Sequence, residues 1–437
     1  MSLNTYKKAL RGNLATSMGK IDKIIGMMIE STGPKASIGD VCKIYPNISA
    51  RYQGKGALAE VVGFKEDKVL LMPYDDSDGI GPGNIVESTG QKLMIKVSDE
   101  LIGRIVDGAA NPIDGYRPLK NFEYYPINGK PTNPLTRPMI TEKMSLGVKT
   151  IDGLLTFGKG QRMGIFAGSG VGKSTLMGMI ARNVSADVNV IALVGERGRE
   201  VREFIQKDLG EEGMKRSILV VATSDQPAMM RSKCALVATA IAEYFKDKGK
   251  DVLLMMDSLT RFAMAQREIG LAIGEPPVSR GYTPSIYTAM PKLLERSGKF
   301  DSGSITGLYT VLVEGDDMNE PIADTVRGII DGHIVLSREV AMRNHYPAID
   351  VQASVSRLMQ AITDARQYEL AGKMRNVMAT YYSNYDLITI GAYKKGSNPK
   401  IDDAIDRMEK INKFLCQGIN ESFTFDETLA LMEEAMS

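Results

Sequence analysis

The chain has 437 residues, of which 43% are hydrophobic and 24% are charged, and this balance excludes both a disordered chain and a membrane-embedded one. A chain of this length is too long for one ordinary hydrophobic core, so we expect two or three domains. Lysine and arginine number 54 against 53 aspartate and glutamate residues. The basic excess that typifies binding to a phosphate backbone is missing, and nucleic acid is not an expected partner.

Cysteine and histidine residues show no sign of a disulfide framework or of a zinc site. Cys42, Cys234 and Cys416 lie far apart without paired spacing, and His333 and His345 have no cluster of ligands beside them, so we interpret both histidines as structural. No apolar run approaches the roughly 18 residues that span a bilayer, and no signal peptide opens the chain. We therefore expect a cytoplasmic protein in which a metal ion accompanies a nucleotide.

Residues 1–30 have apolar residues at three-to-four spacing, which predicts an N-terminal amphipathic helix. Basic residues lie among the apolar ones, so two interpretations stay open: binding to a partner helix or an anionic membrane surface, and packing on its own domain. The apolar positions are Leu10, Leu14, Met18, Ile21, Ile25 and Met28, and the basic positions are Lys7, Lys8, Arg11, Lys20 and Lys23.

Three further regions follow in chain order. In residues 31–97 short apolar runs alternate with Gly, Asp, Asn and Pro turns, which predicts a small β-barrel or sandwich. Residues 98–357 alternate strand-like and helix-like segments, although the proline-rich part at 118–138 is expected to be an extended connector rather than a helix or strand. Residues 358–437 are helix-rich. The expected fold class is α/β, with an N-terminal β-barrel, a central phosphate-loop core and a C-terminal helical domain.

Residues 167–175, AGSGVGKST, have the pattern of a phosphate-binding loop between an apolar strand and a helix. Backbone amides of such a turn and of the helix N-terminus supply fixed partial positive charge for phosphate groups. The pattern is relaxed at its first position, where Ala167 replaces glycine. Lys173 is expected to reach the β- and γ-phosphates and Ser174 to bind Mg²⁺. The predicted nucleotide-binding residues are Gly168, Ser169, Gly170, Val171, Gly172, Lys173, Ser174 and Thr175.

Three residues outside the loop are candidates for ATP hydrolysis. Asp257 ends the apolar strand DVLLMMD, where a second carboxylate behind Mg²⁺ is expected. Glu196 follows NVIALVG at a strand end, where a carboxylate orients water, although the same pattern fits a surface glutamate. Arg357 lies in DVQASVSRLM. Its guanidinium suits a phosphoryl transition state, although an isolated arginine more often forms a surface salt bridge.

These motifs together resemble the hexameric rotary-type ATPase family, which includes the catalytic subunits of the ATP synthases, over nearly the whole chain. LIGRIVDGAANPIDG at 101–115 and GVKTIDGLLTFGKGQR at 147–162 are similar to its stretches at the barrel-to-core crossing and before the phosphate loop. The resemblance implies a RecA-like core that uses ATP and Mg²⁺. It also implies catalytic roles for Lys173, for Glu196 with its interface neighbour Arg197, for Arg261 in the DxxxR run that begins at Asp257, and for the finger Arg357, and it implies adenine stacking by Tyr346.

Within that family the chain resembles the ATPases of type III protein export, nearer the flagellar branch than the virulence-associated one. The similar features are Ala167 and Ser174 of the loop, LLTFGKGQRMG, and EPPVSRGYTPSIYTAMPKLLERSG at 275–298. An ATP synthase catalytic subunit would show glycine and threonine at those two loop positions. The resemblance implies ATP hydrolysis that energises export and helps to release or unfold export substrates from chaperones at the export gate.

The same resemblance implies partners. Glu196 and Arg357 occur together in this chain, which a homohexamer satisfies because each copy lends its arginine to the next site. The stretches 280–285 and 315–321 resemble loops that face a central stalk, and the C-terminal helices resemble the family's contact with export substrates and chaperones. Regulatory stator-like export proteins and peripheral contact with a membrane export gate, at the inner face of the cell membrane, are implied as well. The segment FLCQGINESF departs from the synthase pattern of a second aromatic at the base, so no adenine contact is assigned to it.

Other functions stay open on the sequence alone. A subunit of an ATP synthase or of a vacuolar-type ATPase would need a partner chain and a membrane motor. An RNA-translocating hexamer would need basic and stacking aromatic residues on its barrel, where this chain has many acidic residues and few aromatic ones. A nucleotide-binding scaffold without activity is disfavoured, because the lysine and both carboxylates of the site are intact.

Overall fold

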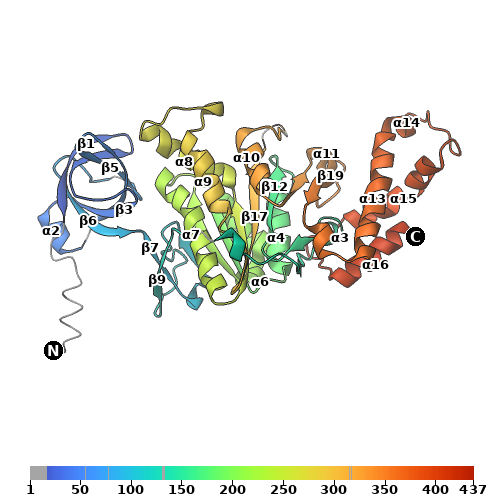
Figure 1. Cartoon of the computed structure of the whole chain (residues 1–437), viewed down its shortest axis with the longest axis horizontal. Helices are drawn as coiled ribbons and strands as arrows, with labels where there is room; N and C mark the ends of the chain where they lie inside the picture. The colour runs from blue at the N-terminus through green and yellow to red at the C-terminus, as the bar shows by residue number, and fades with distance from the viewer. Residues whose placement is uncertain (1–16, 55, 77, 130–132, 314, 316) are drawn as a thin grey trace.

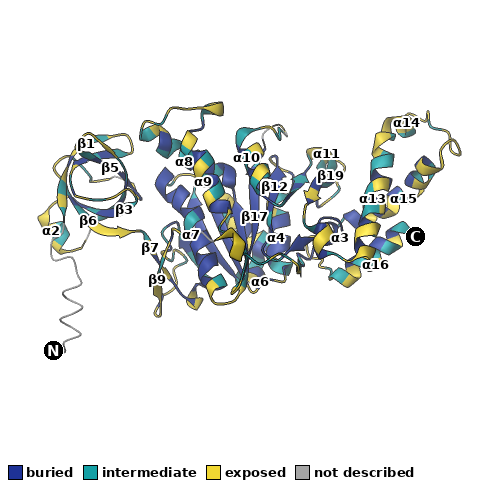
Figure 2. Ribbon diagram, in the orientation of Figure 1, coloured by how far each residue is buried: buried dark blue, intermediate teal, exposed yellow. Residues whose placement is uncertain are grey.

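Three structural parts follow one another along the longest axis of the molecule: a barrel, a sheet covered by helices, and a group of C-terminal helices (Figure 1). The structure is a computed structural model that describes residues 17–54, 56–76, 78–129, 133–313, 315 and 317–437. Figure 2 shows that buried residues concentrate in the central sheet and its covering helices. Within the described residues, no helix is both long enough and apolar enough to cross a membrane.

The first described segment is a β-hairpin and not the helix predicted for residues 1–30. Strands β1 (Met18–Ile25) and β2 (Met28–Thr32) pair antiparallel. Gly26, in the turn between them, has a φ of +58°, a conformation that glycine adopts without steric cost. Residues 1–16 of the predicted helix lie outside the described residues.

The helical prediction was wrong because the apolar spacing in this short segment also fits strands. Ile21 and Ile29 are buried inside the barrel, whereas Met18 and Ile25 are about half exposed, at 50% and 48%. Long-range pairing decides between the two structures, since β1 also pairs with β6 and thereby closes the barrel. A barrel without this hairpin would have two open strand edges, which proteins avoid.

The barrel is a closed sheet in the strand order β1-β2-β5-β4-β3-β6. It begins at Met18, so the predicted range 31–97 omits its first hairpin. Strand β6 escapes sequence analysis because only Val86 and Ser88 among its residues are buried. The remaining barrel elements are β3 (Asp40–Tyr45), α2 (Ile48–Tyr52), β4 (Ala57–Lys65), β5 (Lys68–Pro73) and β6 (Ile85–Lys92).

A two-stranded ribbon joins the barrel to the core. Strand β7 (Met94–Val97) leaves the barrel and pairs antiparallel with β9 (Glu123–Pro126). The connector at 118–138 therefore contains a strand, against the prediction of none. Proline is compatible with this strand because Pro126 stands at its end and the ribbon pairs on one side only. Short elements nearby are η1 (Asp99–Leu101), η2 (Pro134–Thr136), β10 (Lys143–Met144) and β11 (Phe157–Gly158).

A nine-stranded sheet in the order β19-β18-β12-β17-β15-β13-β14-β8, with β16 paired to β17, forms the core. Its strands are parallel except β16 and β19. Their apolar runs are nearly continuous because helices cover both faces. The strands are β8 (Ile105–Asp107), β12 (Arg162–Ala167), β13 (Val188–Glu196), β14 (Ser217–Thr223), β15 (Asp251–Asp257), β16 (Gly298–Phe300), β17 (Gly303–Leu312), β18 (Gly332–Leu336) and β19 (Ile349–Ser356).

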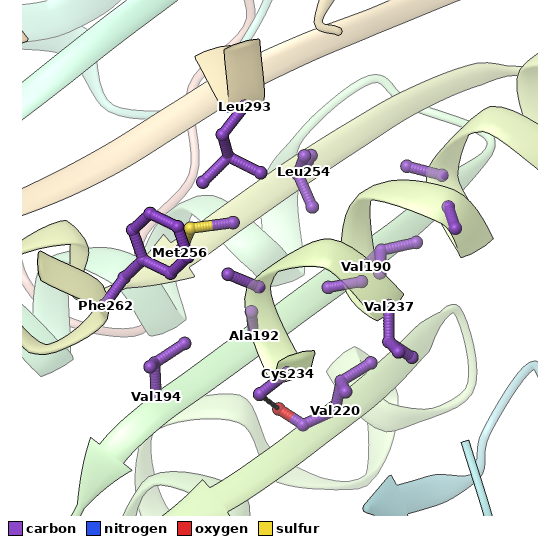
Figure 3. Close-up of a cluster of buried hydrophobic side chains, with 14 of the residues drawn as sticks. Val190, Ala192, Val194, Val220, Cys234, Val237, Leu254, Met256, Phe262 and Leu293 are labelled. Atoms are coloured by element: carbon purple, nitrogen blue, oxygen red, sulfur yellow. Dashed lines mark hydrogen bonds between the residues drawn. The ribbon is translucent and has the colours of Figure 1, made fainter. Parts of the chain in front are cut away.

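Figure 3 shows how one face of this sheet is filled. Val190 and Val194 of β13 and Val220 of β14 pack against Val237 and Cys234 of helix α7, and all five are fully buried. The Cys234 thiol lies 3.3 Å from the backbone oxygen of Val220. The three cysteines are free thiols, in agreement with their unpaired spacing in the sequence.

The helices of the core connect the parallel strands, and those of the C-terminal part pack on one another. Helix α16 also contacts α3 of the core. The core helices are α3 (Lys149–Leu154), α4 (Lys173–Asn183), α5 (Gly198–Glu203), the π-helical η3 (Phe204–Leu209), α6 (Gly210–Met214), α7 (Ala228–Asp247), α8 (Leu259–Ala272), η4 (Ser279–Gly281), α9 (Pro284–Leu294), α10 (Pro321–Ile329) and α11 (Arg338–Met342). The C-terminal helices are α12 (Met359–Ile362), α13 (Ala365–Ser383), α14 (Tyr385–Thr389), α15 (Pro399–Leu415) and α16 (Phe425–Met436).

Candidate active site

The phosphate loop connects β12 to α4 at the carboxyl edge of the parallel strands. Gly170 and Gly172 have φ of +80° and +86°, in the left-handed region that favours glycine. Gly172 is the N-cap of α4 and offers no side chain to its first amide groups. Those amides and the helix dipole are therefore available to an anion, as the sequence predicted for residues 168–175.

Lys173 lies between two carboxylates from neighbouring strands. Its ammonium group is hydrogen bonded to Oδ1 of Asp257 and is 3.9 Å from Oε1 of Glu196. Thr310 donates a second hydrogen bond of 2.7 Å to the same oxygen of Asp257. The side chains of Lys173, Glu196 and Asp257 are at most 13% exposed. The structure thus brings together three of the residues that the sequence selected separately.

The backbone near Glu196 is irregular, which separates this carboxylate from the regular strand. The pairing register of β13 with β14 shifts between Val194 and Glu196, and Gly195 has a φ of +68°. A Cβ at Gly195 would lie 3.2 Å from Cβ of Arg261, so Arg261 packs beside the Glu196 backbone. The Nε of Arg261 is buried without a hydrogen-bond acceptor among the described residues.

Burial, with the negative charge of Asp257, raises the pKa of Glu196 to about 7, although the positive charge of Lys173 opposes the shift. We expect the affinity for an ATP analogue with Mg²⁺ to strengthen between about pH 8 and about pH 6, because protonation removes a negative charge from beside the phosphates. Binding titrations at several pH values measure this effect. In Glu196→Gln the affinity should stay flat over that range, and equal slopes in both proteins would assign the titration to another group.

Tyr346 lies next to the phosphate loop. A Cβ at Gly172 would lie 3.6 Å from two carbons of the Tyr346 ring, and the ring is 42% exposed. The segment between α15 and α16 lies beside this tyrosine, since the backbone N–H of Gln417 donates to the backbone oxygen of Tyr346 at 3.0 Å. The Gln417 side chain accepts from the Lys149 amide at 2.9 Å and donates to the Gly147 oxygen at 2.8 Å. Sequence analysis assigned nothing to this glutamine.

We expect Tyr346→Ser to raise KM for ATP by roughly tenfold with little change in kcat, because stacking of a base on an aromatic ring contributes about 1–3 kcal/mol. Tyr346→Phe keeps the ring and is the matched control, with a KM near that of the wild type. Steady-state hydrolysis measured over a range of ATP concentrations separates the two constants. A fall in kcat at unchanged KM would argue against a base-binding role.

Arg357 lies at the opposite edge of the sheet from its own phosphate loop. Leu336 of β18 pairs with Ala167 at the loop edge, whereas Gly332 pairs with Ser356 at the other end of β19. The six residues of β12 separate the two edges by roughly 17 Å at the usual rise per residue. Arg357 therefore does not reach the loop of its own chain.

The side chain of Arg357 is exposed at this edge and lies near Arg327 and His333. The backbone amide of Arg357 donates to the backbone oxygen of Asp331 at 3.0 Å. Its Nη2 donates to the backbone oxygen of Arg327 at 3.4 Å, near the end of α10. Burial lowers the pKa of His333, the hydrogen bond with the Ala353 backbone oxygen opposes this shift, and the charges of Arg327 and Arg357 add to it. The exposed guanidinium of Arg357 can therefore contact an anionic group that comes from outside the chain.

Two other predicted features lie apart from the lysine and its carboxylates. Arg197 is 76% exposed and pairs with Glu200 at 3.3 Å. Arg280 and Asp317 form a hydrogen-bonded ion pair of 2.7 Å, which joins the stretch 280–285 to the described part of 315–321.

A strand, a glycine-rich turn and a helix in this order, with acidic strand ends beside the lysine of the turn, occur in phosphate-loop nucleotide hydrolases, and the chain is a protein of that class. The family model of the "ATP synthase alpha/beta family, nucleotide-binding domain" matches residues 147–356, and the β-barrel model of the same family matches residues 21–90. A model named "T3SS EscN ATPase C-terminal domain" matches residues 363–434. The chain belongs to the ATP synthase alpha/beta family, in the branch of flagellum-specific ATP synthases and type III secretion ATPases.

Curated relatives and solved structures match the chain over nearly its full length. It is 58% identical to the flagellum-specific ATP synthase of Bacillus subtilis over 95% of this chain and 94% of the relative. It is 49% identical to the type 3 secretion system ATPase of Xanthomonas euvesicatoria over 95% and 93%. The structure of the assembled ATPase EscN from enteropathogenic E. coli has a TM-score of 0.90 at 45% identity and covers 96% of this chain and 100% of that chain. The family and the fold class predicted from the sequence are confirmed.

Proposed function

We propose that this chain hydrolyses ATP to power type III protein export, in the flagellar branch, as a ring of identical copies. The observation that carries this proposal is the match of residues 363–434 to the C-terminal domain of a secretion ATPase. The barrel and the nucleotide-binding domain match models named for the whole ATP synthase family, so the C-terminal domain is the part that distinguishes export from synthesis. The similarity to an assembled EscN supports the ring.

In this proposal the residues around the phosphate loop divide the chemistry. Lys173, released from Asp257 and Glu196 by the arriving nucleotide, holds the β- and γ-phosphates. Ser174 is exposed at the start of α4 and Asp257 is buried behind it. A hydroxyl and a carboxylate are the hard oxygen donors that suit Mg²⁺. Bound Mg²⁺ would neutralise phosphate charge, Glu196 would orient and polarise the attacking water, and Tyr346 would stack on the adenine.

The finger Arg357 acts on the site of the neighbouring copy. Its distance from its own loop and the exposure of its side chain support this assignment. A guanidinium that enters from a neighbour stabilises charge on the transferring phosphoryl group only when two copies are in register. Each copy therefore supplies a nucleotide site at one edge of its sheet and a finger at the other. Arg197 and Arg261 are proposed to support the same interface.

Partners follow from the position of the remaining features. The structure of EscN with its central stalk EscO has a TM-score of 0.88 at 44% identity, which supports a central stalk that contacts the loops joined by Arg280 and Asp317. Export substrates and their chaperones are proposed to meet the C-terminal helices. Stator-like regulators and the export gate would hold the ring at the inner face of the cell membrane.

Chromosomal replacement of the chain by Glu196→Gln tests the proposed function in the native cell. Export of extracellular filament proteins should fall to background while respiratory growth stays normal. Loss of respiratory growth with normal export would instead indicate an ATP synthase subunit. Capture of the intact chain with its bound partners adds a second readout: RNA in place of export proteins would indicate a nucleic-acid translocase.

A further inference from the structure

One short segment before the phosphate-loop domain exposes two large apolar side chains to solvent. Leu135 is 92% exposed and Met139 is 84% exposed, and they are the most exposed large hydrophobic side chains among the described residues. We call Leu135 and Met139 together the apolar knob. Single exposed apolar residues are ordinary, whereas two such residues on one short segment are a candidate for contact with a partner surface.

Hydrogen bonds within its own turn order the backbone that carries Leu135. Asn133 accepts a hydrogen bond of 3.0 Å from the Leu135 amide, and Thr136 donates one of 2.9 Å back to the Asn133 oxygen. Pro134 stands in the first turn of η2, and its fixed φ removes alternatives. A surface that is already ordered loses little conformational entropy when it binds.

Arg137, between the two knob residues, fastens the segment to the core. Its guanidinium donates to the Ser297 oxygen at 3.2 Å and to the Glu295 oxygen, and it lies over the Phe300 ring at 5.3 Å. Its side chain is 21% exposed. The arginine thus faces inward where its two apolar neighbours face outward.

A chain of ion pairs and hydrogen bonds connects Arg137, in the knob segment, to the finger Arg357. Glu295 pairs with Arg162 at 2.5 Å, and Arg162 donates two hydrogen bonds of 3.1 Å to the Asp331 carboxylate. The backbone oxygen of Asp331 in turn accepts a hydrogen bond of 3.0 Å from the Arg357 backbone amide. Residues 137, 295, 162, 331 and 357 form one continuous frame along the amino edge of β12. The segment that carries the knob and the backbone of Arg357 are therefore linked through the same contacts.

We propose that the apolar knob binds the adjacent copy of this chain and holds Arg357 at that copy's nucleotide site. The inference rests on the proposed function, because it takes Arg357 to act in trans. A second copy is the occupant that fits, since the frame that carries the knob also carries the finger, and the finger has no phosphate site on its own chain within reach. Apolar contact at the centre of such an interface supplies affinity while the arginine supplies chemistry.

The double variant Leu135→Ser/Met139→Ser in the full chain tests this inference. Sedimentation velocity with a non-hydrolysable ATP analogue and Mg²⁺ should show the assembly midpoint at a roughly tenfold to hundredfold higher protein concentration. Turnover per chain should fall at low protein concentration and recover at high concentration, while the affinity of the monomer for the analogue stays unchanged. Ile390→Ser, 73% exposed on the C-terminal part, is the matched control and should assemble normally.

Three outcomes would overturn the inference. The first is a wild-type assembly midpoint for the double variant. The second is co-sedimentation of the wild type, but not of the double variant, with phosphatidylcholine–phosphatidylglycerol vesicles at equal assembly. The third is failure of the conservative exchange Leu135→Met/Met139→Leu, which keeps the apolar surface, to assemble as the wild type does. If instead the wild type itself never assembles and Arg357 proves dispensable, the trans arrangement of the proposed function fails and the knob inference fails with it, whereas the three outcomes above overturn the knob alone.

Discussion

Replacing Arg357 with alanine will lower ATP turnover by roughly 10³-fold or more, the usual contribution of an arginine finger, while nucleotide binding stays nearly intact. The side chain is exposed at the edge of the sheet opposite its own phosphate loop. Its removal leaves Lys173, Asp257 and Tyr346 in place to hold ATP. Single-turnover hydrolysis and analogue binding measure the two properties separately.

Mixing this variant with Glu196→Gln chains gives the stronger test of the trans arrangement. In a mixed ring, a site that has Glu196 on an Arg357→Ala chain and Arg357 on the next chain is complete. At equal amounts about one interface in four meets that condition if chains assemble at random. Activity should therefore peak near the equal mixture although each parent is inactive. Mixed rings that stay inactive at every ratio would contradict catalysis by a neighbour's arginine.

Glu196→Gln alone will lower turnover by roughly 10²–10³-fold, the range for loss of a group that orients and activates the nucleophile. Binding of the ATP analogue should persist or strengthen, because the amide carries no charge to repel phosphate. Glu203→Gln is the matched control, since the Glu203 side chain is 40% exposed and pairs with Arg199 outside the buried cluster.

The comparison of the two glutamate variants decides between a catalytic and a structural role. A comparable fall in Glu203→Gln would show that charge in this region matters in general and that Glu196 has no special function. Loss of analogue binding in Glu196→Gln would show that the residue holds Lys173 in position instead of acting on water. Rapid-quench measurement of the hydrolysis step distinguishes these results from slow product release.

The sequence predicted best those features that depend on residues close together in the chain, namely the buried strands and the glycines of the phosphate loop. The strands that end at Ala167, Glu196 and Asp257 are nearly continuous apolar runs, because buried parallel strands have no polar face. The glycines that the phosphate loop requires were visible for the same local reason. The identity of these residues, their order and their position at strand ends were therefore all predictable.

The features that the sequence did not reveal depend on contacts between segments that are distant in the chain. The hairpin β1–β2 was mistaken for a helix because closure of the barrel, and not local periodicity, selects strands there. The position of Arg357 at the far edge follows from the antiparallel pairing of β19 with β18, and no spacing in the sequence reveals it. Gln417 is hydrogen bonded to Tyr346 and Lys149, which are both far from it in the sequence. The residues around Gln417 in the sequence therefore gave no indication of its position.

The separation of Glu196 and Arg357 across one sheet gives the molecule a polarity. Each copy has an acceptor edge and a donor edge, and in a ring of such copies every interface joins a donor edge to an acceptor edge. A ring of this kind has no two-fold axes, and its donor edges all point in the same direction around the ring. If the finger acts in trans as proposed, each nucleotide site contacts the finger of a single neighbour, so the fold of one chain sets the direction around the ring in which that contact is made.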